Sequence, residues 1–276
     1  MSYKDLLVIL DHSRHCRARL AVAVALARRF GTHLTGLYAI RGLDLSPFLA
    51  DQFPPEALDA AHARVAQQRD DIQAMFRAAT EGGGITSAWR EVRGDATELA
   101  IWHARHADMA VLGQPDPEEQ DAATNGVSAD RFLLGTGRPT LMIPYSTAVD
   151  SLGKRILVAW NGSPQAARAV NDALPLLAAA EKVVVLKVDQ GTPTVEDEGG
   201  GDLAAHLARH GIAAEMRDIA PDDIEPADVL LSYAADEGSD LIVMGVYGHS
   251  RLRELALGGV SRQMLSQMTV PVLMAH

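Results

Sequence analysis

One strand–helix pattern occurs twice along this chain of 276 residues. In both halves an apolar run such as Leu-Val-Ile-Leu or Leu-Val-Ala-Trp stops at a polar turn that contains a serine. Three pairs of similar segments mark the repeat: residues 7–13 with 157–163, 110–113 with 242–245, and 138–142 with 270–274. The repeat is longer than the periods of solenoid proteins, so it indicates two domains rather than an array.

Short β-rich runs alternate with helical stretches within each copy. Strands are expected at residues 6–10, 34–40, 86–92, 109–113 and 140–145, and again at 155–160, 183–188, 213–218, 241–245 and 270–275. Helices are expected at residues 16–30, 56–80, about 95–106, from 164 onward, 202–210, 227–237 and 262–268. Asp95 and Ser163 stand where a helix N-cap is needed.

This alternation implies right-handed crossovers and buried parallel strands. We therefore predict an α/β fold of two tandem doubly wound domains, each a five-stranded parallel sheet with helices on both faces. The polar stretch 146–153 separates a last strand from a first strand, so the domains are expected at residues 1–147 and 154–276.

The charge balance and the single cysteine limit the classes of partner. The chain has 36 acidic and 25 basic residues, a net charge of −11, so it lacks the basic surface that attracts nucleic acid or anionic membranes. Cys16 alone cannot form an internal disulfide; we interpret it as a buried core residue. The sequence shows no signal peptide or membrane span, and a cytoplasmic protein is expected.

A glycine-rich loop follows the fourth strand of the second half. Gly245 and Gly248 are followed by nine residues and then by Gly258, just before a predicted helix. Ligands of open α/β sheets bind at the carboxyl ends of strands, and a helix N-terminus attracts anions. His249 and Arg251 lie in the loop, so its charge suits a phosphate group.

The corresponding loop of the first half is acidic. Residues 114–121 contain four carboxylates and no Lys or Arg, which predicts repulsion of a phosphate. The sequence Gly-Val-Ser at 126–128 still resembles residues 259–261, so the first half is interpreted as a decayed copy of the site. Asp11, at the end of the first strand, is interpreted as a cap of that strand end.

The spacing of glycine, two residues, glycine, nine residues, glycine is similar to the nucleotide-binding motif of the universal stress protein family. The segments 155–163 and 244–274 resemble the opening and the end of such a domain, and the whole chain resembles a tandem member. The resemblance implies an adenine nucleotide (ATP, ADP or AMP), with or without Mg²⁺, bound in the second half. The residues implied are Asn161, Val188, Gly245, Gly248, His249, Arg251, Gly258, Gly259, Val260 and Ser261.

Two of these residues depart from the family pattern. Asn161 stands where ATP-binding members usually carry Asp, and Gly259 replaces the usual Ser or Thr. Val188 would use its backbone to pair with adenine. The resemblance also implies that the two halves pair through their last strands, imitating a dimer, and further homodimerisation is left open.

Three functional interpretations follow. The first is an adenine-nucleotide-binding regulatory or protective protein of the stress response; the others are a ligand-free interaction module and a slow ATP hydrolase. No general base is evident near the loop, so no catalytic residue is assigned. The histidine pairs His12 and His15, His103 and His106, and His206 and His210 are interpreted as solvated side chains, not metal ligands.

Overall fold

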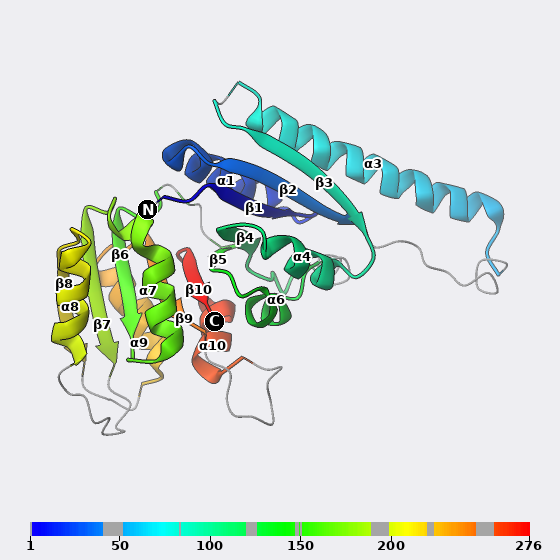
Figure 1. Ribbon diagram of the computed structural model, residues 1–276. Helices are drawn as coiled ribbons and strands as arrows, with labels where there is room; N and C mark the ends of the chain where they lie inside the picture. The colour runs from blue at the N-terminus through cyan, green and yellow to red at the C-terminus, as the bar shows by residue number, and fades with distance from the viewer. Residues whose placement is uncertain are drawn as a thin grey trace.

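The computed structural model describes residues 2–40, 52–82, 84–119, 126–146, 149, 151–188, 199–219, 224–246 and 257–276 (Figure 1). The strands of the first half are β1 (Asp5–Leu10), β2 (His33–Ile40), β3 (Ser87–Arg93), β4 (Met109–Gly113) and β5 (Thr140–Ile143). Its helices are α1 (Cys16–Phe30), α3 (Pro55–Thr80), α4 (Ala96–Ala104) and α6 (Ala129–Thr136).

The second half repeats this order of elements. Its strands are β6 (Arg155–Trp160), β7 (Lys182–Val188), β8 (Ala214–Ile219), β9 (Leu241–Gly245) and β10 (Val272–Ala275). Its helices are α7 (Pro164–Leu177), α8 (Gly199–Arg209), α9 (Pro226–Asp236) and α10 (Gly259–Gln267).

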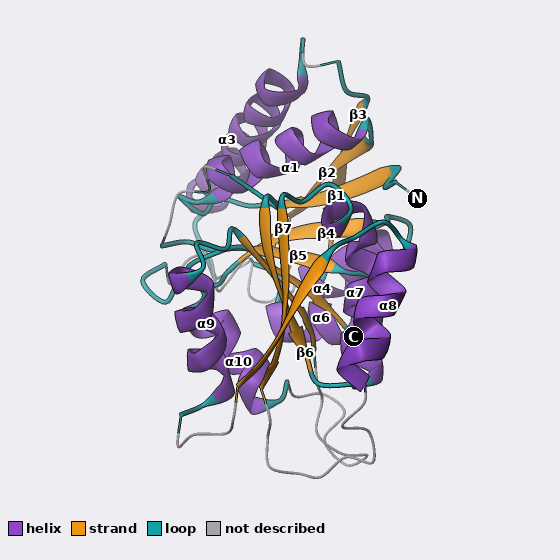
Figure 2. Ribbon diagram, turned by 90° about the vertical axis from the view of Figure 1, so that its left-hand side faces the viewer, coloured by secondary structure: helices purple, strands orange, loops and turns teal. Residues whose placement is uncertain are grey.

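The ten strands form one sheet in the order β3-β2-β1-β4-β5-β10-β9-β6-β7-β8. Neighbouring strands are parallel within each half, and among the described strands only β5 and β10 pair antiparallel, with Leu141 opposite Leu273. The predicted fold of two tandem doubly wound domains is confirmed. The expected pairing of the last strands is also present and joins the two five-stranded sheets edge to edge (Figures 1 and 2).

Helices cover both faces of the sheet. One buried cluster packs α1, α3, α7 and α8 against it, and the other packs α4, α6, α9 and α10 against the opposite face. Each cluster contains residues from both halves, so the apolar core crosses the β5–β10 joint. Figure 2 shows α9 and α10 on one side of the second-half strands and α7 and α8 on the other.

Hydrogen bonds also connect the halves. The Tyr3 hydroxyl donates to the Asp172 carbonyl at 2.7 Å, and Gln114 Nε2 donates to the Leu265 carbonyl at 2.9 Å. Arg29, on α1, donates from Nη1 to the Leu152 carbonyl at 2.8 Å. The two halves therefore form one packed body.

Several predicted boundaries are wrong by a few residues. The last strands are shorter than 140–145 and 270–275, because Pro144 and Pro271 have no backbone N–H to donate to a sheet. The predicted helix 262–268 begins at Gly259, and the predicted helix 202–210 begins at Gly199, because glycine is compatible with both a loop and the start of a helix. Helix α6 was not predicted. Both N-caps are confirmed: Asp95 accepts from the Glu98 N–H, and Ser163 from the Ala166 N–H.

No helix in the described part of the chain combines the length and the apolar composition needed to cross a bilayer.

Candidate functional site

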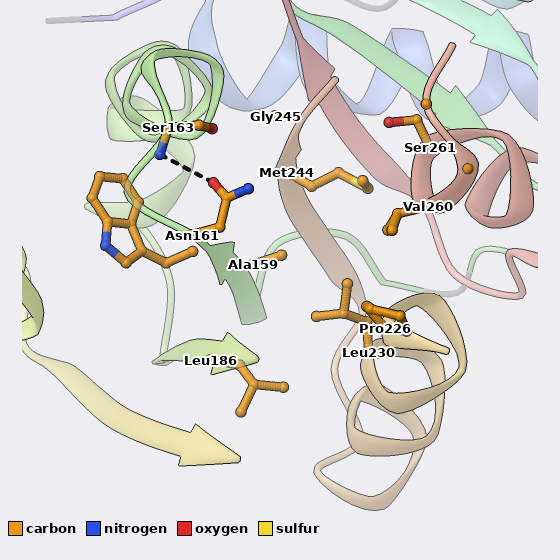
Figure 3. A pocket seen from close by; sticks show the side chains of 13 residues that line it. Ala159, Asn161, Ser163, Leu186, Pro226, Leu230, Met244, Gly245, Val260 and Ser261 are labelled. Atoms are coloured by element: carbon orange, nitrogen blue, oxygen red, sulfur yellow. Dashed lines mark hydrogen bonds between the residues drawn. The ribbon is translucent and has the colours of Figure 1, made fainter. Parts of the chain in front are cut away.

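A cavity of about 420 Å³ lies at the carboxyl ends of β6, β7 and β9 (Figure 3). We call it the second-half cavity. It lies where β6 is flanked by β7 and β9, which is the point at which the strand order reverses and where ligands of such sheets bind. Its lining residues are Ala159, Trp160, Asn161, Ser163, Leu186, Pro226, Leu230, Met244, Gly245, Gly258, Gly259, Val260 and Ser261.

The turn after β6 places Asn161 at the cavity wall. Asn161 Oδ1 accepts a hydrogen bond from the Ser163 N–H at 3.1 Å, and Gly162 between them has a φ of 72°. Because the turn uses the side-chain oxygen, the amide nitrogen of Asn161 faces the cavity, on the side of Met244 (Figure 3). An aspartate would offer only acceptors here, whereas asparagine offers a hydrogen-bond donor.

Gly245 ends β9 directly beneath the first turn of α7. A Cβ atom on this residue would lie 2.5 Å from the Ala166 nitrogen and 2.6 Å from the Gln165 carbonyl carbon. The sequence interpretation assigned this glycine to close approach of an anion. The structure adds a packing reason, because only glycine allows β9 and α7 to approach this closely.

The N-terminus of α10 forms the opposite wall. Gly258 is its N-cap residue, and among the described residues a Cβ on Gly259 would meet no atom within 4 Å. Because α10 begins at Gly259, the backbone of Val260 and of the buried Ser261 belongs to the first turn. Backbone N–H groups in the first turn lack helical partners and favour an anion.

The predicted site residues divide into two groups. The structure brings Asn161, Gly245 and the segment 258–261 together around one cavity. Gly248, His249 and Arg251 lie outside the described residues. Val188 is the last residue of β7, as expected, and its side chain also lies outside the described part.

The sequence interpretation missed the apolar wall of the cavity. Leu186, Met244 and Leu230 line it, with Trp160 and Pro226. The sequence held a signal for Leu186 and Met244, because both lie near the ends of predicted strands. All residues of the described chain that line the cavity are uncharged.

The first half places an ion pair between a partly buried aspartate and a buried arginine at the matching position. Asp11 follows β1 and accepts from the Ser13 N–H at 2.9 Å, as Asn161 does after β6. Its second oxygen lies 2.8 Å from Arg19 Nη2, and Arg19 Nε donates to the Ile9 carbonyl at 2.8 Å. Burial alone would raise the pKa of Asp11, but the Arg19 charge and the Ser13 hydrogen bonds outweigh it and lower that pKa.

Arg19 also explains why residue 113, the counterpart of residue 245, is a glycine. A Cβ on Gly113 would overlap the Arg19 guanidinium. The same glycine position therefore accommodates a helix backbone in one half and a buried arginine in the other. Cys16, on the same helix, is buried as predicted, and its burial raises the pKa of the thiol.

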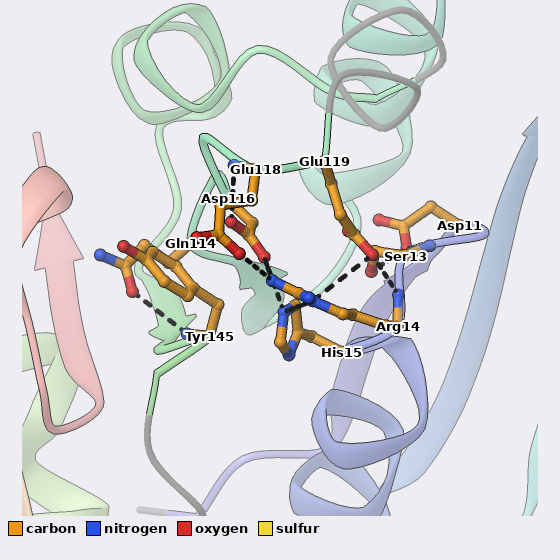
Figure 4. A network of polar contacts seen from close by, with 9 residues as sticks. All are labelled: Asp11, Ser13, Arg14, His15, Gln114, Asp116, Glu118, Glu119 and Tyr145. Carbon is orange, nitrogen blue, oxygen red and sulfur yellow. Dashed lines mark hydrogen bonds and ion pairs between the residues drawn. The ribbon is translucent and has the colours of Figure 1, made fainter.

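The acidic loop of the first half is held by basic side chains (Figure 4). Arg14 Nη2 lies 2.7 Å from Asp116 Oδ2 and 3.1 Å from Glu118 Oε2, and the Arg14 N–H donates to Glu119 Oε1 at 2.8 Å. His15 Nε2 lies 2.9 Å from Asp116 Oδ2. We call these five residues the Arg14 latch. The turn before α1 thus brings basic groups to the acidic loop, which the local sequence of residues 114–121 does not show.

The histidine pairs considered as metal ligands meet other groups. Contacts of the described residues include His12 Nε2 with the Tyr38 hydroxyl at 2.5 Å, His103 Nδ1 with Arg90 Nη1 at 3.1 Å, and the rings of His206 and His210 at 4.8 Å. His15, Asp116 and Glu119 bring three potential ligand atoms within 4.8 Å of one another, and Asp116 already forms an ion pair with Arg14 at 2.7 Å.

Comparison with known proteins identifies relatives of both halves. The model of the universal stress protein family matches residues 2–135 and 153–276. Universal stress protein Slr1230 of Synechocystis is 25% identical over 175 residues, which cover 60% of this chain and 57% of that protein. Universal stress protein MJ0577 of Methanocaldococcus jannaschii is 38% identical over 48 residues, 17% of this chain and 30% of that protein. The chain thus matches less than two thirds of either relative.

Solved structures resemble the whole chain. A universal stress protein from Archaeoglobus fulgidus matches with a TM-score of 0.77 and 16% identity, covering 98% of this chain and 95% of that one. Protein PA1789 from Pseudomonas aeruginosa, described as functionally unknown, matches with a TM-score of 0.58 and 18% identity over 99% and 92%. At these identities the likeness concerns the fold. Because the family model matches both halves, this chain belongs to the universal stress protein family and carries two of its domains in tandem.

Proposed function

We propose that the second-half cavity binds an adenine nucleotide and that the protein acts as a nucleotide-responsive regulatory or protective factor in the cytoplasm. The observation that carries the proposal is the position of the first turn of α10, which faces the Asn161 turn across a cavity of about 420 Å³. A cavity of this size lies within the range of small-molecule sites, about 300–1,000 Å³.

The two kinds of wall suit the two ends of a nucleotide. Leu186, Leu230 and Met244 offer apolar surface to a base, and the first turn of α10 offers N–H groups to a phosphate. The binding residues proposed are Asn161, Val188, Gly245, Gly248, His249, Arg251, Gly258, Gly259, Val260 and Ser261. Mg²⁺ would accompany a triphosphate in this proposal.

The test is calorimetric titration with ATP and Mg²⁺ of the full chain, stripped of bound ligand. Gly259→Glu places a carboxylate beside the α10 N-terminus, where a Cβ meets none of the described residues within 4 Å and where the charge repels phosphate but favours the helix. Gly201→Glu is the matched control, because a Cβ on Gly201, in the first turn of α8, also meets none of the described residues within 4 Å.

We expect one ATP per chain, binding at least tenfold weaker in Gly259→Glu, and unchanged binding in Gly201→Glu. A chain that shows no saturable binding at millimolar ATP would contradict the proposal and favour an interaction module without a ligand. Equal loss in both variants would also contradict it, because the added charge would then act from a distance.

A further inference from the structure

Two histidines lie next to each other at the end of α8. His206 is in the last turn of the helix, and His210 directly follows its last residue. Because residues four apart lie on the same side of a helix, the two side chains are neighbours. Their imidazole rings are in contact, with centroids 4.8 Å apart and planes at 64°. We call these two residues the α8 histidine pair.

The α8 histidine pair differs from the other two histidine pairs in its hydrogen bonds. A ring nitrogen of each histidine in those pairs, His12 and His15, His103 and His106, lies within hydrogen-bond distance of another protein group. His206 Nε2 is buried and has no hydrogen-bond partner within the described part of the chain. Buried polar atoms are normally paired, so this nitrogen points to a ligand that supplies the missing partner.

The burial of His206 corrects the sequence interpretation, which treated both histidines as solvated. Leu203 and Leu207, each three residues before a histidine, are buried in the core. The α8 histidine pair therefore lies at the margin of the core-facing side of α8, where His206 is half-buried and His210 is exposed. An ion can reach the pair from solvent on the side of His210.

The backbone at the end of α8 is fixed by hydrogen bonds. The N–H groups of His210 and Ile212 both donate to the Leu207 carbonyl at 3.0 Å. Gly211 between them has a φ of 77°, the left-handed conformation that commonly ends a helix. A ligand that joins the two imidazoles therefore has to order only their side-chain torsions.

The surroundings of the α8 histidine pair favour a cation. The C-terminal end of a helix carries a partial negative charge, and both histidines are at that end. Asp202 lies four residues before His206 and so on the same side of the helix. Arg209 is adjacent in sequence to His210, but helical periodicity directs it to a different side.

The ligand chemistry of the pair selects a class of metal ion. Imidazole nitrogen suits Zn²⁺, Ni²⁺ and Cu²⁺, whereas Mg²⁺ and Ca²⁺ take oxygen ligands. Two histidines four residues apart on one helix are also the pair that binds zinc in helical metal sites. We propose that the α8 histidine pair binds one divalent transition-metal ion of the Zn²⁺ class, with water in the remaining coordination positions.

This metal site is separate from the proposed nucleotide site. Helix α8 lies along the edge strand β8 (Figure 1), and His210 shortly precedes Ala214 at the amino end of that strand. The second-half cavity lies at the carboxyl ends of β6, β7 and β9, which run parallel to β8. The two sites are therefore at opposite ends of the sheet, and the metal proposal does not rest on nucleotide binding.

The test is calorimetric titration of the full chain with ZnCl₂, after removal of bound metal with a chelator and in the absence of nucleotide. His206→Gln and His210→Gln each remove one ligand and keep a polar side chain of similar length. His62→Gln is the matched control, because His62 is an exposed histidine on another helix, α3. Circular dichroism checks that each variant is folded.

Hydrogen exchange of the backbone amides locates the bound ion. An ion that joins both imidazoles closes the last turn of α8, so it should slow the exchange of amides there. We expect saturating Zn²⁺ to slow this exchange at least threefold in the wild-type chain and in His62→Gln. It should leave the exchange unchanged in His210→Gln.

We expect one Zn²⁺ per chain at this site, bound at least tenfold more weakly by His206→Gln and by His210→Gln. His62→Gln should change the affinity less than twofold. The proposal is overturned by absence of saturable binding at submillimolar Zn²⁺, by unchanged affinity in either ligand variant, or by equal loss in His62→Gln. Binding that leaves the exchange of α8 amides unaltered also overturns it, because the ion would then lie elsewhere.

Discussion

At the scale of single residues, Gly245 and Gly259 serve opposite purposes. Gly245→Ala would place a Cβ 2.5 Å from the Ala166 backbone, so β9 and α7 must separate; overpacking of this kind costs about 1–3 kcal/mol. We expect a lower midpoint of urea unfolding. Gly259→Ala, whose Cβ meets none of the described residues within 4 Å, is the control and should be neutral or slightly stabilising. If the two variants have equal free energies of unfolding, β9 and α7 separate without loss of stability and the expectation is wrong.

Gly259 also gives a prediction about binding affinity. Gly259→Ser adds a hydroxyl beside the α10 N-terminus, and its Cβ meets none of the described residues within 4 Å. One neutral hydrogen bond contributes about 1 kcal/mol, which corresponds to roughly fivefold tighter ATP binding. Calorimetric comparison of the ATP affinities of Gly259→Ser and Gly259→Ala separates the effect of the serine hydroxyl from the effect of the added Cβ atom. If alanine tightens binding as much as serine, the hydroxyl makes no contact.

At the scale of elements, the Arg14 latch joins the loop after β4 to the start of α1. The Glu118 N–H donates a hydrogen bond to the Asp116 carboxylate. This bond is the main cause that lowers the pKa of Asp116 to about 2, and hydrogen bonds from His15 and Arg14 lower that pKa further. A carboxyl whose pKa falls on folding stabilises the folded state above its ordinary pKa of 3.8. That stabilisation is lost as the pH falls toward about 2.

We therefore expect Asp116→Asn to be less stable than the wild-type chain at pH 6, with a difference that shrinks as the pH falls below about 4. Chemical unfolding at several pH values measures the difference. The carboxyl carbon resonance of Asp116 should titrate with a midpoint near 2. A midpoint near 4 would mean that the latch is open in solution.

At the scale of the whole molecule, β5 covers the edge of β10 and so completes the second-half sheet. Residues 154–276 expressed alone would expose that edge, which is a template for antiparallel pairing. We expect light scattering to show a dimer of this fragment at micromolar concentration. A fragment that stays monomeric while its circular dichroism remains native would contradict this expectation.

The sequence predicted most of the fold because local patterns carry that information. Apolar runs such as Leu6–Leu10 are buried on both faces of the sheet, and Asp95 and Ser163 cap helices through residues three positions away. Boundaries that depend on glycines, such as the start of α10, were less accurate, because glycine is compatible with both a helix start and a loop.

The sequence by itself determined the duplication, the α/β class and the strand ends that hold the two copies of the site, because each is encoded by periodicity and by turns between close neighbours. Only the tertiary structure decided what the two copies of the site contain. The pairing of Arg19 with Asp11, the pairing of Arg14 with Asp116, and the packing of Gly245 under α7 join residues from different elements. Such contacts depend on the crossing of helices over the sheet, and a linear pattern does not record that geometry.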